Sequence, residues 1–210
     1  MYYVFFIGMI LADLVAVMAF YKAYSKSKMP MLGILTLWFT SRFFAGLLSF
    51  IWNSGFHWNP KHVQNVSTLF EAYLMVKFCM LFITKKVKFL NVLWVLPAII
   101  YGIELYVYDF SYDSYHYSTL SYYLITSLLL IQILVKEKIP KDLLIFVNIM
   151  FVFHICSVVF TGSLDILLDD VELFKMVYPF VWIIYMAVDI MSLWVLRKWS
   201  KQLFEMDLMS

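Results

Sequence analysis

Two charged side chains lie inside a stretch that is otherwise apolar enough to cross a bilayer. Residues 65–84, NVSTLFEAYLMVKFCMLFIT, carry Glu71 and Lys77. Ionised groups in a membrane helix are costly, so they mark places where charges pair, where water enters, or where ions and protons pass. Six residues correspond to about 600° of helical turn, which leaves these two side chains about 120° apart. They therefore cannot neutralise each other, and their helix needs at least two neighbours.

Other apolar stretches carry further ionisable residues at a similar depth. Counted at about 1.5 Å per residue from the flanking lysines, Asp13, Lys77 and Asp189 lie about 12–14 Å deep. On the same scale Arg42 lies about 16 Å deep and His154 about 19 Å. These five residues form one predicted intramembrane charged layer, contributed by five helices. The carboxylates Glu71 and Glu104 are expected nearer the outer face.

The layer has a structural and a functional interpretation. In the first, Asp13 and Arg42 clamp two helices together, Lys77 extends its ammonium toward the headgroups, and His154 makes a helix contact. In the second, the lone carboxylates Asp189 and Glu71 mark an ion or proton path.

Arg42 is the deepest permanent charge, because a guanidinium stays protonated in proteins. We expect Asp13 to be its partner, since a short loop joins their two stretches and the depths agree. Asp189 is the alternative acceptor, and Lys77 would then pair with Asp13.

A second candidate site is an outer mouth, rich in acids and tyrosines, on two loops. Acidic groups beside aromatic faces suit a cationic or amphipathic ligand. The alternative is that outer loops merely lack basic residues while tyrosines anchor at the interface. The residues of this outer mouth are Asp109, Asp113, Asp165, Asp169, Asp170, Glu172, Tyr112 and Tyr115.

Several chemistries find no support in the sequence. Residues 176–196 contain no lysine, so a retinal Schiff base is not expected. His154 and Cys156 are two residues apart, hence about 200° apart on a helix, which is poor geometry for a metal site or a nucleophile–base pair. No HExxH, Gly-x-Ser-x-Gly or ion-filter motif is present. We therefore assign no catalytic residue, metal ligand or cofactor, and expect no nucleic-acid partner.

These residues must be positioned by membrane helices. The chain of 210 residues is 64% hydrophobic and only 14% charged, against about 25% charged in soluble domains. Apolar stretches near 20 residues, the length that crosses a bilayer, recur along it. We predict one all-α domain over residues 1–210, a seven-transmembrane-helix bundle. The spans are 2–21, 31–52, 65–84, 89–108, 119–135, 143–162 and 176–196, with a kink at Pro97.

Basic residues predict the orientation of this bundle. Twelve Lys and Arg residues lie in the loops 22–30, 85–88 and 136–142 and in the C-terminal tail, whereas only Lys61 and Lys175 lie in the other loops. Basic residues in short loops mark the cytoplasmic side. We therefore expect the N-terminus outside and the C-terminus in the cytoplasm. The expected location of the protein is the plasma (inner) membrane.

A short similarity suggests an internal repeat. The sequence Lys-x-Lys-x-Pro occurs at Lys26–Pro30 and again at Lys136–Pro140, each time before a span. Spans one to three and five to seven would then be parallel repeats, a plan that transporters use. The alternative is that Lys and Pro are common where a membrane helix starts.

Two classes of function follow. The first is a non-enzymatic sensor or accessory subunit, which binds a ligand or a protein partner through the bundle. The polarised faces and the missing catalytic motifs favour it. The second is a transporter for small solutes or one coupled to ions, favoured by the charged layer and the repeat. Beyond the lipid bilayer, the expected partners are a membrane or cytoplasmic protein and a cationic small ligand.

Overall fold

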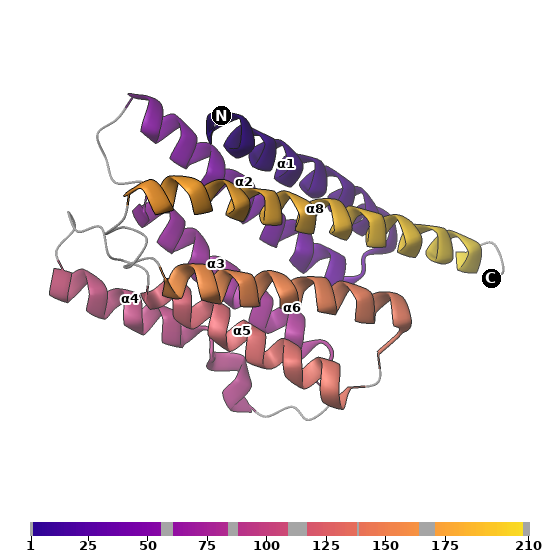
Figure 1. The fold of residues 1–210 in the computed structure, drawn as a ribbon. Helices are drawn as coiled ribbons and strands as arrows, with labels where there is room; N and C mark the ends of the chain where they lie inside the picture. The colour runs from indigo at the N-terminus through magenta and orange to yellow at the C-terminus, as the bar shows by residue number, and fades with distance from the viewer. Residues whose placement is uncertain are drawn as a thin grey trace.

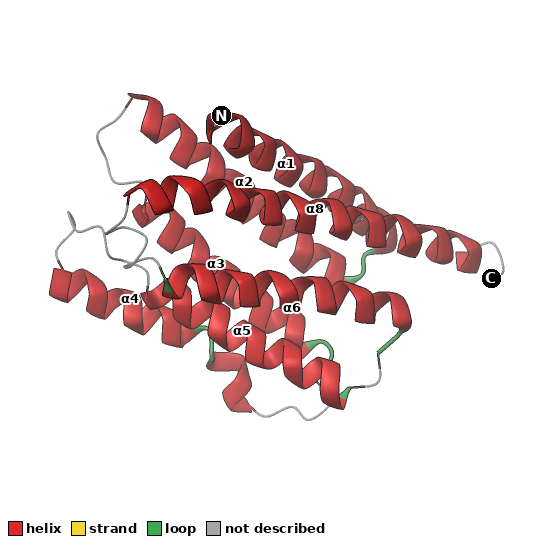
Figure 2. Ribbon diagram, viewed as in Figure 1, coloured by secondary structure: helices red, strands yellow, loops and turns green. Residues whose placement is uncertain are grey.

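The computed structural model describes residues 2–55, 61–83, 88–108, 117–137, 139–163 and 171–207. These ranges contain helices and short connections but no strand, which confirms the all-α prediction (Figure 2). Seven α-helices and one 3-10 helix make up this described part. They are α1 (Tyr2–Ser27), α2 (Pro30–Gly55), α3 (Lys61–Met80), η1 (Lys88–Val92), α4 (Val95–Tyr108), α5 (Tyr117–Lys136), α6 (Lys141–Gly162) and α8 (Val171–Asp207).

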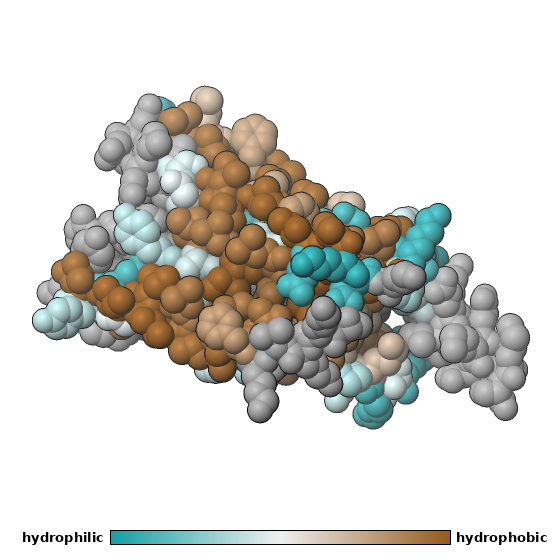
Figure 3. Space-filling view, turned by 90° about the horizontal axis from the view of Figure 1, so that it is seen from below, coloured by the Kyte–Doolittle hydropathy of each residue, from teal (hydrophilic) through white to brown (hydrophobic). Residues whose placement is uncertain are grey.

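Five of these helices are long and apolar enough to cross a membrane. The apolar spans, within the ranges given above, are Val4–Ser27, Pro30–Ile51, Tyr117–Lys136, Lys141–Gly162 and Pro179–Trp199. Large apolar side chains face outward from them, and hydrophobic residues form a broad area of the face drawn in Figure 3. So much exposed apolar surface is stable in lipid rather than in water. The chain is therefore a membrane protein with several transmembrane helices.

Two predicted spans, 65–84 and 89–108, take a different form. α3 is not among the five apolar spans, and α4 has only 14 residues, about 21 Å against a hydrocarbon core of about 30 Å. The kink expected at Pro97 is instead a break, because α4 starts two residues before this proline and η1 precedes it. Proline is tolerated in the first turn of a helix, where backbone N–H groups have no helical partner. That α3 and α4 also cross the membrane stays a prediction.

Six helices form a closed ring, in which each packs against the next. The order around the ring is α1, α2, α3, α5, α6 and α8, and α8 then packs against α1 (Figure 1). α4 lies outside this ring, against α5 and α3. α4 brings the chain back to the end of the bundle where α3 begins. The ring neighbours α3 and α5 therefore run in the same direction, and so do α1 and α8 (Figure 1).

The two ends of the bundle differ in the helices that begin there. The N-terminal end is where α1, α3, α5 and α8 begin, and the basic end is where α2 and α6 begin, beside Lys28 and Lys141. At the basic end only residues 28–29 separate α1 from α2. The N–H of Lys28 donates to the carbonyl of Tyr24 at 2.8 Å, in a left-handed conformation with φ 54° that terminates α1. Pro30, whose φ is already helical, then begins α2.

The ring interior differs between its two halves. Toward the basic end it is filled by fully buried apolar side chains, including Phe20, Leu35, Phe78, Leu130 and Phe146. Toward the N-terminal end, α2, α3, α5 and α6 bury polar residues instead, including Ser49, Asn65, Thr68, Ser118 and Thr161. α1 and α8 fill their side of that half with a smaller apolar cluster of Phe6, Met9, Ile10 and Trp182. We call these the apolar half and the polar half.

Candidate functional site

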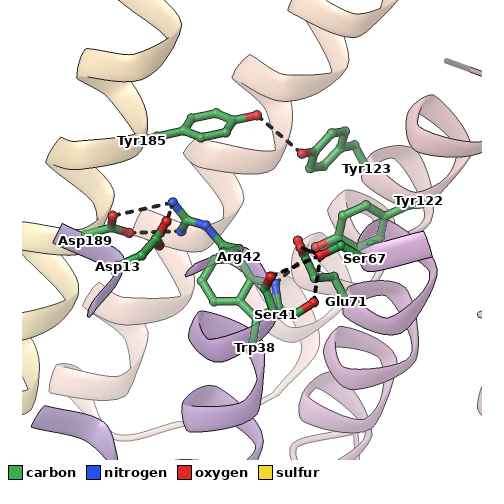
Figure 4. Close-up of polar contacts among 10 residues, drawn as sticks. All are labelled: Asp13, Trp38, Ser41, Arg42, Ser67, Glu71, Tyr122, Tyr123, Tyr185 and Asp189. Atoms are coloured by element: carbon green, nitrogen blue, oxygen red, sulfur yellow. Dashed lines mark hydrogen bonds and ion pairs between the residues drawn. The ribbon is translucent and has the colours of Figure 1, made fainter. Parts of the chain in front are cut away.

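Arg42 lies between two carboxylates at the boundary of the two halves. Its Nη1 donates to Oδ1 of Asp189 at 2.9 Å, and its Nη2 to Oδ2 of the same residue at 3.4 Å. The same Nη2 is 3.2 Å from Oδ1 of Asp13 (Figure 4). Both predicted acceptors therefore contact Arg42, and Asp189 makes the two-pronged contact that suits a guanidinium.

Three neighbouring helices of the ring bring these charges together. Asp13 is on α1, Arg42 on α2 and Asp189 on α8, and α1 packs against both of the others. A glycine helps α1 and α2 to approach closely: a Cβ at Gly46 would lie 3.1 Å from Cγ1 of Ile10. Small residues at such contacts are typical of membrane helices.

Aromatic rings surround the rest of the guanidinium. Its central carbon is 4.8 Å from the ring centroid of Trp38 and between 5.4 and 5.6 Å from the centroids of three other rings. These rings belong to Phe39, Phe153 and Tyr185. The negative face of an aromatic ring attracts a cation, so the cage compensates part of the desolvation of Arg42.

Glu71 belongs to the same charged region through a serine relay. Ser67, one turn earlier on α3, donates to Oε1 of Glu71 at 2.9 Å. A hydroxyl has one hydrogen, so in the 2.7 Å contact between the Ser67 and Ser41 hydroxyls it is Ser41 that donates. Ser41 precedes Arg42 on α2, and Glu71 is close enough to interact electrostatically with that arginine. Figure 4 shows the relay beside the ion pairs.

A second polar chain connects α2 with α5 and α6. The indole N–H of Trp38 can only donate, so the Tyr122 hydroxyl accepts from it at 3.4 Å. His154 Nδ1 is 2.7 Å from the carbonyl of Met150, which can only accept, so this nitrogen carries the imidazole proton. The Tyr122 hydroxyl then donates to the free Nε2 at 3.2 Å. Full burial favours the neutral imidazole that this assignment requires, and the direction of the whole chain then follows.

The remaining members of the predicted layer take separate places. His154 bonds to Tyr122 and Met150 rather than to the acids on α1 and α8. Lys77 is half-buried with its ammonium 5.5 Å from the Tyr73 ring centroid, and no carboxylate in the described ranges pairs with it. The predicted layer is thus divided into an ion-paired centre, a histidine chain and a peripheral lysine.

Glu104 has a structural contact. It is buried on α4, and its Oε1 accepts the backbone N–H of Tyr117 at 2.7 Å. Both of its oxygens also lie 3.4 Å from the N–H of Ser118. These N–H groups open α5 and have no helical partner, so Glu104 caps that helix and complements its dipole.

The outer mouth lies almost wholly outside the described residues. This applies to Asp109, Asp113, Asp165, Asp169, Asp170, Tyr112 and Tyr115. Glu172 is described, and it is exposed in the first turn of α8.

Sequence reasoning missed Trp38, Tyr122, Ser41, Ser67 and Tyr185. A local signal existed for three of them, because Trp38, Ser67 and Tyr185 each precede a deep charge by four residues. Residues four apart share a helix face. Trp38 and Ser67 contact the charges that follow them, and Tyr185 presents its ring to Arg42, the partner of Asp189. No such signal pointed to Tyr122, whose partners are on other helices.

Comparisons of the chain with protein-family models, with curated proteins and with solved structures find no match.

Proposed function

We propose that the protein is a non-enzymatic sensor or accessory subunit of the plasma membrane, and that a ligand or partner is received in the polar half. In this proposal all seven helices cross the bilayer, and the N-terminal end faces outward. The contrast between the two halves carries the proposal. Buried hydroxyl and amide groups toward one end can bind a polar guest, whereas the described interior toward the other end is filled mainly by apolar side chains.

The position of α2 supports a route for the signal. Through Arg42 it holds α1 and α8, and through Trp38 it holds α5 by way of Tyr122. A guest that moves α2 in the polar half would therefore disturb both connections together. Packed interfaces of this kind switch between discrete arrangements rather than deforming gradually.

The proposed ligand is cationic, because most outer-mouth acids belong to the segments that join α4 to α5 and α6 to α8 at the N-terminal end. Replacing Asp169 and Asp170 with Asn should weaken its binding, and the difference should shrink at high salt, since screening acts on exposed charges. The measurement is the melting temperature of the purified protein against a panel of organic cations. If no cation shifts the melting temperature of either version, the acids serve topology alone.

Cysteine accessibility tests the proposed function. Cys79 and Cys156 are first replaced by Ala and Ser, and single cysteines are then placed at matched buried positions of the two halves. On α2 the pair is Ser49→Cys and Leu35→Cys, and on α5 it is Ser118→Cys and Leu130→Cys. All four native side chains are at most 1% exposed, so differences in labelling report access rather than surface position.

A receptor should react with a membrane-impermeant thiol reagent only in its polar half and only from the N-terminal side. Ligand should then protect Ser49→Cys or Ser118→Cys. Labelling of Leu35→Cys or Leu130→Cys from the basic side would contradict the proposal, because it would require a path through the apolar half. Absence of labelling at all four positions would contradict it as well.

A transporter is the second candidate function, and the order of the ring favours it. The ring order is the same when α1, α2 and α3 are matched in turn with α5, α6 and α8, because each pair of neighbours then corresponds to another pair of neighbours. Parallel repeats separated by one linking helix would produce this order, and α4 would be that helix. A carrier should give labelling of the polar-half cysteines from the N-terminal side and of the apolar-half cysteines from the basic side.

A further inference from the structure

The buried centre contains more acids than bases. Arg42 is its one cation among the described residues, whereas Asp13, Asp189 and Glu71 are three carboxyl groups from three other helices. The side chains of Asp13 and Asp189 are fully buried, and that of Arg42 is 6% exposed. With every group ionised, the centre would carry two uncompensated negative charges away from water. A buried unpaired charge is strongly destabilising in proteins, so a cation is needed to reduce the excess.

The geometry points to the aspartate pair as the place for that cation. The two carboxyl groups meet at one nitrogen, Nη2 of Arg42, which has to serve both. Asp189 receives two hydrogen bonds from the guanidinium. Neither oxygen of Asp13 accepts a hydrogen bond from any described group, although this carboxyl is aimed at the other two charges (Figure 4). Asp13 is therefore the carboxyl whose hydrogen-bonding capacity is least satisfied.

The other titratable groups around the pair do not remove the excess. Glu71 on α3 adds to it. His154 on α6 is fully buried, which disfavours a charged imidazole, and it bonds to Met150 and Tyr122 rather than to the acids. Tyr185 on α8 presents a ring to Arg42, and its hydroxyl is 3.3 Å from that of Tyr123 on α5. None of these groups supplies a positive charge.

A proton fits this centre better than a metal ion. No group of three or more His, Cys, Asp or Glu side chains in the described ranges is arranged to hold a metal. A proton needs only one carboxyl oxygen as its base and a second as hydrogen-bond acceptor. We propose that Asp13 and Asp189 hold one exchangeable proton between them, as a proton-binding site at the centre of the bundle beside Arg42.

This inference goes beyond the proposed receptor function, because a proton site would serve a receptor or a carrier equally well. Loss of the proton would leave two carboxylates competing for Nη2. The contact between α1 and α8 would then weaken while the chain from Trp38 to His154 stays intact. The site would therefore make the junction of α1, α2 and α8 responsive to protons.

Infrared spectroscopy of the whole protein in lipid nanodiscs tests the site. At neutral pH the spectrum should contain the carbonyl band of a protonated carboxylic acid, and this band should shift in D₂O because the proton exchanges. Labelling aspartate with carbon-13 at its carboxyl group should move the band, whereas labelling glutamate should not. These measurements need no substitution, so they do not depend on a variant that folds.

Variants then locate the proton. The band should persist in Glu71→Gln and vanish in both Glu71→Gln/Asp13→Asn and Glu71→Gln/Asp189→Asn. Glu104→Gln is the matched control and should leave it unchanged, because that carboxylate caps α5. A missing band, a band that follows the glutamate label, or its loss in Glu71→Gln alone would overturn the proposal. Loss of the band when K⁺ is replaced by Na⁺ at constant pH would overturn it as well, by assigning the site to an alkali-metal ion.

Discussion

Trp38 and Arg42 lie one turn apart on the same face of α2, with the guanidinium carbon 4.8 Å from the indole ring centroid. The arginine bonds to α1 and α8, while the indole N–H bonds to Tyr122 on α5. Two adjacent side chains of one helix thus hold opposite sides of the ring. Because the two side chains also contact each other, a displacement of either one is felt by the other.

The ion-paired centre should respond to substitution as a set of three. Arg42→Leu alone leaves two buried carboxylates without their cation and should cost about 3–5 kcal/mol, whereas removing a complete buried set can be nearly neutral. The double variant Arg42→Leu/Asp13→Leu should recover only in part, because Asp189 remains unpaired. The triple variant that adds Asp189→Leu should recover most of the folded yield, measured by size-exclusion chromatography and melting temperature. Full recovery in the double variant would mean that Asp189 is not a partner.

The tyrosine hydroxyls give a matched pair of substitutions. Tyr122→Phe removes a group that both accepts from Trp38 and donates to His154, so it leaves two buried partners unsatisfied, each costing about 1–3 kcal/mol. Tyr123→Phe removes one contact, to the hydroxyl of Tyr185. Thermal unfolding should therefore show a larger loss for Tyr122→Phe. Equal losses would argue against the directed chain.

Glu104 should act on stability through its cap. Glu104→Ala removes the acceptor for the first N–H groups of α5 and should cost about 0.5–2 kcal/mol, the usual range for a lost helix cap. Glu104→Gln keeps an acceptor oxygen and should lose less. The melting temperatures of the two variants measure this difference. A variant with unchanged stability but lost ligand response would instead make Glu104 a binding residue.

Reporter fusions test the seven crossings and the orientation. Fusions after Lys86, Lys138 and Ser210 should report the cytoplasm, because the basic loops are expected there. A fusion after Asp113 should report the outer side if the short α4 crosses the membrane. The same compartment for the fusions after Lys86 and Asp113 would show that α4 does not cross, and an outer signal after Lys138 would reverse the orientation.

The five apolar helices could be predicted because a span needs only length and low polarity, which composition reveals directly. The prediction of one kinked helix over residues 89–108 was wrong, because the apolar character of this stretch does not show that a helix begins close to Pro97. The exclusion of α4 from the ring has no counterpart in the sequence. It depends on which helix faces pack together, and apolar faces look alike whether they meet lipid or another helix.

The residues of the site could be predicted only in part. A buried arginine needs acids, and only a few deep carboxyl groups were available, so Asp13 and Asp189 were named. Depth alone placed Lys77 in the layer, but depth carries no information about rotation around the helix axis. The cap made by Glu104 could not be predicted, because its partners are backbone N–H groups, which every residue except proline possesses.

The order in which Arg42 acquires its two partners has a consequence for how the chain enters the membrane. α1 and α2 emerge before α8 during synthesis, as a hairpin joined by residues 28–29 that already contains Asp13 and Arg42. This hairpin can partition into the bilayer with its deepest charges paired. Asp189 follows Arg42 by 147 residues and arrives only with α8. A nascent chain stopped before α8 should therefore remain inserted, with Asp13 alone paired to Arg42. Synthesis of α8 then adds Asp189 and closes the ring.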